Sequence, residues 1–245
     1  MRLDFTGWCY RMAFSLADKL GMNQDQADIM RFGLETLAGM ACKAIILLTL
    51  AWALGILGAV LAVLITAGAL RLVAGGVHCT SYERCLTFGL VTFLGLGEIA
   101  QLVSRYLGGV GQTGGGLWIL YLGTFLLALA VCVAYAPQDS PARPLAIEEK
   151  HGFRWLAVGM VVLWGLGVAW RSGKPVEIWV ASSLGLMMEA FSLTPWGTRV
   201  VKLIDSWLAR ILPGGGEADE EVGPGPASPC GLYADGGRVP RGKVS

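Results

Sequence analysis

Charged side chains are scarce in this chain of 245 residues. They make up 15% of the composition, whereas hydrophobic residues make up 54%. A typical soluble domain carries about 25% charged residues. The formal net charge is +1, so the chain lacks the clustered positive charge that recognition of a phosphate backbone requires. We therefore expect no nucleic-acid partner and look instead for membrane-spanning segments.

The chain also has few sequence features of the kind that bind metal ions. The chain has two histidines and six cysteines, and no two cysteines form a C-x-x-C motif. A zinc site built on His78, Cys79 and Cys85 would need a distant fourth ligand. We therefore expect neither a metal nor another cofactor.

Long apolar stretches, by contrast, recur along the chain. A helix needs about 20 mostly apolar residues to cross a bilayer. The sequence therefore predicts an all-α polytopic membrane protein with about six transmembrane helices. The predicted spans are 37–55, 58–74, 86–104, 117–136, 153–170 and 176–194.

The two terminal segments differ from the spans. Apolar residues recur every three or four positions within residues 1–20, which predicts an amphipathic helix in the headgroup plane. The alternative is a soluble helix packed on the ends of the spans. Residues 212–245 are rich in Gly and Pro and predict a disordered tail that follows a membrane-embedded domain, 1–211. The apolar positions of the N-terminal helix are Phe5, Trp8, Met12, Leu16 and Leu20.

The distribution of Lys and Arg predicts the orientation in the membrane. Basic residues are more frequent in cytoplasmic loops than on the opposite side. One side of the predicted bundle carries most of them, while the other side holds only Arg105, Arg171 and Lys174. We therefore expect both termini and the segment 71–85 to be cytoplasmic.

The segment 71–85 contains His78 and Cys85, residue types that form a base and a nucleophile. A thiol needs a base or a positive field to become a nucleophilic thiolate. On one continuous helix, however, a separation of seven residues corresponds to about 10.5 Å along the axis, which is too far for a hydrogen bond. Spacing alone therefore favours the alternative that His78 lies at a helix end and Cys85 is a small apolar residue.

A helix start between the two residues would allow them to meet. Thr80 and Glu83 fit a capping box, with Thr80 as the N-cap and Ser81 as the first helical residue. His78 would then lie in the preceding loop, which Gly75 and Gly76 allow to fold back. Cys85 would lie about one turn inside the helix.

The run GGVHCTSYERC, Gly75–Cys85, resembles the signature of the accessory gene regulator B (AgrB) family. Three further stretches resemble the family in the expected order: DIMRFGLE at 28–35, YAPQDSPARPL at 135–145 and GLMMEAFSLTP at 185–195. One departure is Cys79, where the family usually has alanine. The resemblance covers residues 1 to about 200 and raises the question of whether a second thiol competes with Cys85.

The resemblance implies a cysteine endopeptidase of the bacterial cell membrane that processes quorum-sensing pro-peptides. Cys85 would attack a peptide bond of an AgrD-like precursor peptide, and His78 would transfer the proton. The resulting thioester would be resolved by ring closure within the precursor. A homodimer through the glycine-rich spans is a further expectation. The alternatives are a peptide transporter or exporter, and a non-catalytic membrane scaffold that holds the precursor.

Several polar residues are candidates for supporting roles. Glu35 and Asp139 are each expected at the cytoplasmic surface, where a carboxylate could orient the imidazole of His78. Ser81 is a further supporting candidate at the predicted helix start. Arg71 and Arg84 could meet an acidic part of the precursor, with anchoring at the interface as the alternative. Inside the spans, Glu189 is at a depth where it could form an ion pair with Lys43, which is a hypothesis.

Overall fold

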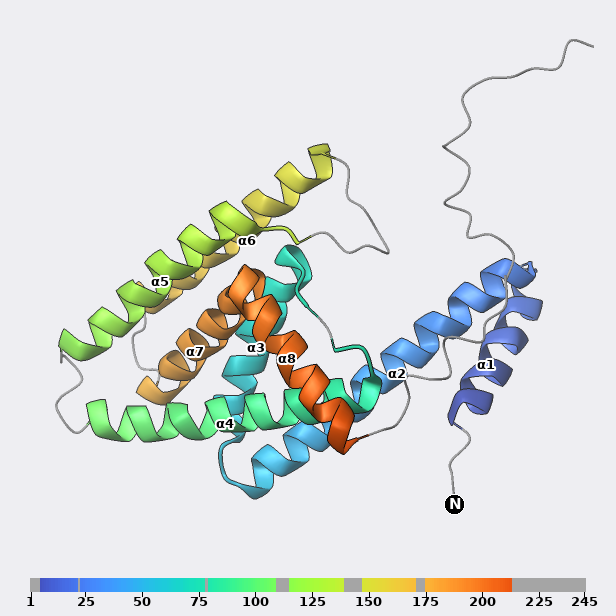
Figure 1. Ribbon diagram of the computed structural model, residues 1–245, viewed down its shortest axis with the longest axis horizontal. Coiled ribbons are helices and arrows are strands. Elements are labelled where there is room, and N and C mark those ends of the chain that lie inside the picture. Colours follow the sequence, from blue (N-terminus) through green and yellow to red (C-terminus); the bar gives the residue numbers. More distant parts are fainter. Residues whose placement is uncertain are drawn as a thin grey trace, which may run out of the picture.

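The computed structural model describes residues 5–21, 23–77, 79–108, 115–138, 147–170 and 175–212. These residues form helices joined by short connections, and they contain no strand (Figure 1). The helices are α1 (Phe5–Lys19), α2 (Gln24–Ala53), α3 (Leu57–Ala74), α4 (Tyr82–Gly108), α5 (Gly115–Tyr135), α6 (Ile147–Ala169), α7 (Val176–Leu193) and α8 (Pro195–Ile211).

Six of these helices, α2 to α7, are long and apolar enough to cross a membrane. The prediction of an all-α polytopic protein is therefore confirmed. The helix that contains the first predicted span begins at Gln24 and therefore extends well before residue 37. Asn23 caps this helix, since its side chain accepts from the backbone of Gln26 at 2.8 Å and the Gln26 side chain accepts from the Asn23 backbone.

The helices of the first two predicted spans, α2 and α3, form a tight hairpin. Gly55 has a φ of 73°, a left-handed conformation that glycine adopts without steric cost. The backbone of Ile56 then donates to the carbonyl of Ala51 at 3.0 Å, and α3 begins one residue later. The connection between the two helices is therefore only three residues long, 54–56.

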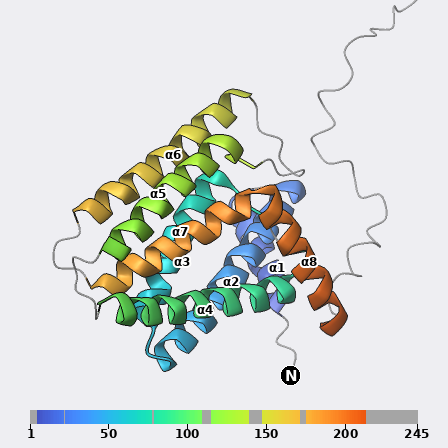
Figure 2. The same cartoon turned by 60° about the vertical axis from the view of Figure 1, so that its left-hand side comes forward.

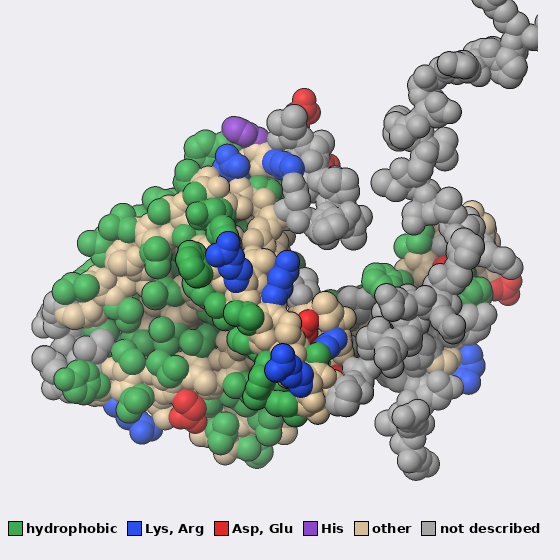
Figure 3. All heavy atoms as spheres, in the orientation of Figure 1, with side chains coloured by type: hydrophobic (Ala, Val, Ile, Leu, Met, Phe, Trp, Pro, Cys, Tyr) green, Lys and Arg blue, Asp and Glu red, His purple; other side chains and the backbone are tan. Residues whose placement is uncertain are grey.

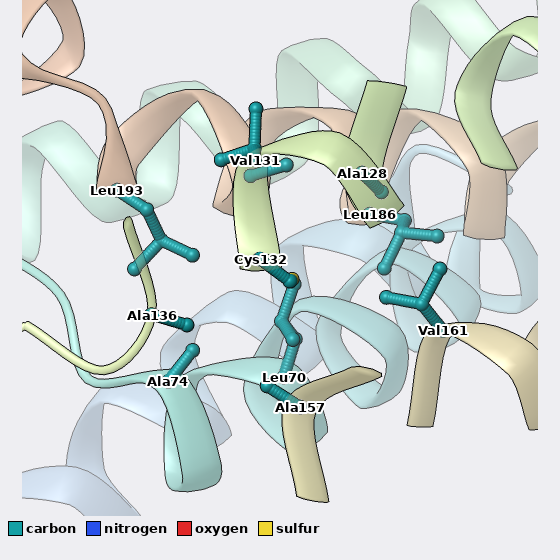
Figure 4. Packing of buried hydrophobic residues seen from close by; sticks show 11 residues of the cluster. Leu70, Ala74, Ala128, Val131, Cys132, Ala136, Ala157, Val161, Leu186 and Leu193 are labelled. Carbon is teal, nitrogen blue, oxygen red and sulfur yellow. The ribbon is translucent and has the colours of Figure 1, made fainter. Parts of the chain in front are cut away.

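Helix α7 is the central helix of the bundle. It packs against α3, α4 and α5, and Figure 2 shows it between the α5–α6 pair and α4. Gly185 allows the closest approach, since a Cβ at that position would lie 2.7 Å from the carbonyl oxygen of Val63 in α3. Small residues allow such close packing between apolar helices. The core beside it contains Leu70, Ala74, Ala128, Val131, Cys132, Ala136, Ala157, Val161, Leu186, Ala190 and Leu193 (Figure 4).

The N-terminal helix α1 lies against α2 and not against the core of the bundle. It packs through Ala13 and Ala17, which are buried. Met12, Leu16 and Leu20 are exposed along the adjacent face. This exposed apolar face is what an interfacial helix requires.

The C-terminal helix α8 was not among the predicted elements. Thr194 ends α7 and is also the N-cap of α8, because its hydroxyl accepts from the backbone of Gly197 at 3.0 Å. Proline follows at the first helical position, where it is well tolerated. The predicted disordered tail begins at Leu212, where α8 has ended, and its residues 213–245 lie outside the described part of the chain.

Candidate functional site

The loop between α3 and α4, residues 75–81, lies beside the ends of α5 and α7. Gly75 and Gly76 have φ values of 76° and 156°, a region that disfavours other residues. The backbone of Gln138 donates to the carbonyl of Ala74 at 2.9 Å, and its side chain donates to the carbonyl of Leu193 at 2.9 Å. Gln138, which follows α5, is therefore hydrogen-bonded to the end of α3 and to the end of α7.

An ion pair between Arg71 and Glu189 holds the first half of the loop. Arg71 Nη1 lies 3.2 Å from Glu189 Oε2, and the Glu189 side chain is almost fully buried. The other arm of the guanidinium donates to the carbonyl of Val77. The predicted pair of Glu189 with Lys43 is therefore wrong, because α7 packs directly against α3, which carries Arg71.

Asp205 of α8 holds the second half of the loop. It accepts from the hydroxyl of Thr80 at 2.8 Å, and its other oxygen lies 3.3 Å from Arg84 Nε. Arg84 Nη2 in turn donates to the Thr80 hydroxyl at 2.8 Å. The predicted capping box is therefore not formed as expected: α4 begins at Tyr82 rather than Ser81, and the Thr80 hydroxyl faces α8.

Both arginines that were candidates for binding an acidic precursor are already paired within the chain. Glu189 neutralises Arg71, and Asp205 neutralises Arg84. The side chain of Arg84 is only 11% exposed, whereas that of Arg71 is 32% exposed. Their observed contacts shape the loop, so a role in binding the precursor remains a prediction for the exposed part of Arg71 alone.

Cys85 is the fourth residue of α4 and is half-buried. Its backbone donates to the carbonyl of Ser81 at 2.9 Å, which is the first hydrogen bond of this helix and places Ser81 at its N-cap. Cys85 thus lies about one turn inside the helix, as predicted. Its proposed base, His78, lies outside the described residues.

Of the two carboxylates proposed to orient His78, only Glu35 lies among the described residues. Asp139 lies outside the described residues. Glu35 is half-buried on α2, and its Oε1 is buried with no hydrogen-bond partner in the described part of the chain. The contacts described above for the α3–α4 loop come from Gln138, which follows α5, and from α7 and α8 instead.

Cys79, the second thiol of the loop, has an electrostatic environment that opposes ionisation. Burial raises the pKa of Cys79, and the neighbouring Cys85 and Asp205 raise it further, against the opposing effects of Arg84 and Lys43. A thiol with a raised pKa is protonated at neutral pH and reacts slowly as a nucleophile. This environment disfavours Cys79 as the reactive cysteine.

Alkylation of Cys79 is therefore expected to need alkaline conditions. In a Cys85→Ala variant, its rate of reaction with iodoacetamide should rise with pH and reach half its maximum above the usual pKa of a cysteine. Asp205→Asn should lower that midpoint, because it removes one of the charges that disfavour the thiolate. Peptide-resolved mass spectrometry measures the rate. A midpoint at or below the usual value in the Cys85→Ala chain would contradict this account.

The arrangement at the start of α4 is suited to nucleophilic chemistry. Among the described residues, no group of three His, Cys, Asp or Glu side chains could hold a metal ion. What the loop presents is a thiol at a helix start, held by two ion pairs from different helices. Asp205 was not among the predicted site residues, although residues 196–211 carry the helical periodicity that indicates α8.

Comparisons with known proteins identify a family and one relative. The family model described as "Accessory gene regulator B" matches residues 9–193. AgrB-like protein 2 of Clostridium perfringens (strain 13 / Type A) is 21% identical over 215 residues, which cover 82% of this chain and 96% of that protein. No solved structure matches the chain. The matched range contains Cys85 and both partners of the Arg71–Glu189 pair, but it ends before α8.

Proposed function

The chain belongs to the accessory gene regulator B family, with a role in that quorum-sensing system, and we propose that it is a membrane cysteine endopeptidase. Its substrate is a short AgrD-like precursor peptide at the membrane surface. Cys85 is the nucleophile and His78 is the base. The observation that carries this proposal is the position of Cys85, one turn inside α4 and directly after a loop held by Arg71–Glu189 and Arg84–Asp205.

The first step cleaves one peptide bond of the precursor. His78 accepts the proton of the Cys85 thiol, and the sulfur attacks the carbonyl carbon of the scissile bond. The carbon–nitrogen bond then breaks, and His78 gives the proton to the departing amine. The N-terminal part of the precursor remains on Cys85 as a thioester.

The second step releases the acyl group without hydrolysis. A thiol or hydroxyl of the bound precursor attacks the thioester carbonyl, which closes a thiolactone or lactone ring and returns the proton to Cys85. Because one acyl bond replaces another, closure to a thiolactone is nearly isoenergetic and needs no ATP. Water competes with this attack, so a site at the membrane edge, where water is scarce, favours ring closure.

The site is proposed to face the cytoplasm. The loop 75–81, the end of α5 and the end of α7 lie at one end of the bundle, and the basic residues of the sequence favour that side as cytoplasmic. A reducing cytoplasm would also keep Cys79 and Cys85 from forming a disulfide. Both thiols are free in the structure.

The thioester provides the direct test of the proposal. A precursor whose ring-forming Cys or Ser is replaced by Ala cannot close the ring, so the acyl-enzyme should accumulate. We expect a mass increase on the peptide that contains Cys85, equal to the N-terminal part of the precursor and removed by neutral hydroxylamine. Cys79→Ala should keep this adduct. Cleavage without any adduct, or an adduct on Cys79, would contradict the assignment of Cys85.

A further inference from the structure

Helix α8 has three distinct faces. At 100° per residue, its exposed apolar side chains fall within an arc of about 80°. The buried residues Gly197, Asp205 and Leu208 lie on a second face, toward the bundle. Exposed cations lie on the third, and Figure 3 shows basic side chains gathered over the part of the molecule where Figure 1 places α8. The apolar arc consists of Trp196, Val200, Leu203, Trp207 and Ile211, and the cations are Arg199, Lys202 and Arg210.

The start of α8 is held at the end of a membrane-spanning helix. Only Thr194 separates α8 from α7, which is one of the six candidate spans. A Cβ at Gly197 would overlap the carbonyl of Phe191, so the corner between the helices needs glycine at this position. α8 thus begins where α7 leaves the bilayer. Its four charged residues and its length of 17 residues make a further crossing unfavourable.

The exposed face of α8 matches a lipid surface in both shape and charge. A narrow apolar arc beside cations is the pattern of helices that lie in the headgroup plane. Arg199 and Arg210 border one edge of the arc, and the Arg199 guanidinium stacks over the Trp196 ring at 5.2 Å from its centroid. The acidic residue of α8, Asp205, points the other way, into the bundle. The exposed charged residues of α8 beside the apolar arc are therefore all positive.

The bundle face of α8 joins this membrane contact to the candidate site. Asp205 contacts Thr80 and Arg84, which lie on either side of the start of α4. Both charged side chains are nearly buried, at 11% exposure for Arg84 and 12% for Asp205. A shift of α8 would therefore move or release the segment between Cys79 and Cys85.

We propose that α8 lies in the headgroup layer of an anionic membrane and that Asp205 is a positioning residue which holds the segment 79–85 against it. The membrane surface then fixes the position of α8, and α8 in turn fixes the segment before Cys85. Helix α8 and Asp205 lie beyond residues 9–193, the range matched by the family model, whereas the segment 79–85 lies within it. This arrangement does not depend on the proposed peptidase activity, because neither lipid contact nor loop position requires turnover.

The lipid contact is tested by measuring the depth of two matched positions. Spin labels are placed at Leu203→Cys in the apolar arc and at Ser206→Cys on the exposed polar face, in the full chain with its other cysteines replaced. Vesicles contain phosphatidylcholine alone or mixed with phosphatidylglycerol. We expect the label at 203 to be accessible to oxygen and shielded from a water-soluble nickel complex, more so with the anionic lipid, and the label at 206 to be in water.

Two outcomes would overturn the lipid contact. One is a label at 203 that is as accessible to the nickel complex as the label at 206 in both vesicles. The other is a label at 203 that becomes shielded only when precursor peptide is added, which would make the arc a peptide-binding surface. Each chain is first checked for native helicity and a single elution peak, so that misfolding is not mistaken for exposure.

The positioning role is tested by the alkylation rate of Cys85 in the vesicle-bound chain, read by peptide-resolved mass spectrometry. Asp205→Asn weakens the contacts to Thr80 and Arg84 and should expose the half-buried thiol. We expect alkylation about fivefold faster, the change that loss of one ordinary hydrogen bond produces in a local opening equilibrium. Asp205→Glu, which keeps the charge, should recover part of the wild-type rate.

The matched control is Ser206→Asn, the neighbouring exposed position, which should leave the alkylation rate of Cys85 unchanged. Trp207→Glu places a charge in the apolar arc without touching the loop, and it should also accelerate alkylation, but only in vesicles and not in detergent micelles. If Asp205→Asn lowers the unfolding temperature while the rate of Cys85 stays at the wild-type value, Asp205 is merely structural and the proposal fails.

Discussion

Replacing Cys85 with alanine is expected to abolish cleavage of a co-expressed AgrD-like precursor. The thiol supplies the electron pair that forms the new bond to carbon, and no other described group at the loop takes its place, because the pKa of Cys79 is raised. His78→Ala should lower the cleavage rate by about 10²- to 10⁴-fold, the usual contribution of a general acid–base. Immunoblotting or mass spectrometry of the precursor in membranes measures both effects.

Two matched variants make this result specific. Cys79→Ala removes the neighbouring thiol, and Cys42→Ala removes an exposed thiol on α2. Both should retain cleavage close to the wild-type rate. A transporter or a passive scaffold predicts something different: the precursor would be cleaved, or left intact, equally in all four variants. Unchanged cleavage in both Cys85→Ala and His78→Ala would therefore overturn the proposed peptidase.

Loss of either partner of the Arg71–Glu189 pair is expected to destabilise the protein strongly. Removing one member of a buried ion pair costs about 3–5 kcal/mol, because the other charge remains without compensation. The lower end of that range applies here, since Arg71 keeps 32% exposure while Glu189 keeps 1%. Arg71→Leu and Glu189→Leu should each lower the unfolding free energy in detergent by about 3 kcal/mol. Cleavage should fall too, because Arg71 also binds the carbonyl of Val77.

A double variant measures the interaction energy between Arg71 and Glu189, apart from what each side chain contributes through its other contacts. Arg71→Leu with Glu189→Leu leaves no unpaired charge, so it should be more stable than the sum of the single losses predicts. The exposed pair of Asp28 and Arg31 is the control. Asp28→Asn should cost no more than about 1 kcal/mol. Strictly additive losses in the double variant would show that the two side chains contribute separately.

The transmembrane helices are the part of the fold that the sequence predicts best. Spanning length and hydropathy depend on local composition, so all six spans could be placed from residues 37–194 alone. The start of α2 could not be placed in this way, because residues 24–36 are polar enough to resemble a loop. Asn23 and Gln26 cap the helix much earlier, and α1 packs on that extension.

The candidate site was predictable only in part. Cys85 one turn inside a helix follows from local signals near Thr80 and Ser81, and the structure differs by one residue at the helix start. The partners of the loop are distant in sequence, at separations of 118 residues for Arg71 and Glu189 and 125 for Thr80 and Asp205. A hydrophobicity pattern contains no information on such pairs. The incorrect pairing of Glu189 with Lys43 came from depth in the membrane, which two helices can share without touching.

By itself, the sequence determined the class of this protein, its six spans and the segment that carries Cys85, because hydropathy and short motifs are local properties. Tertiary structure alone decided which charges meet. The packing of α7 on α3 brings Glu189 to Arg71, and the corner at Gly197 turns α8 back so that Asp205 reaches Thr80 and Arg84. Those contacts depend on helix packing and on one tight turn, and they are what hold the loop before Cys85.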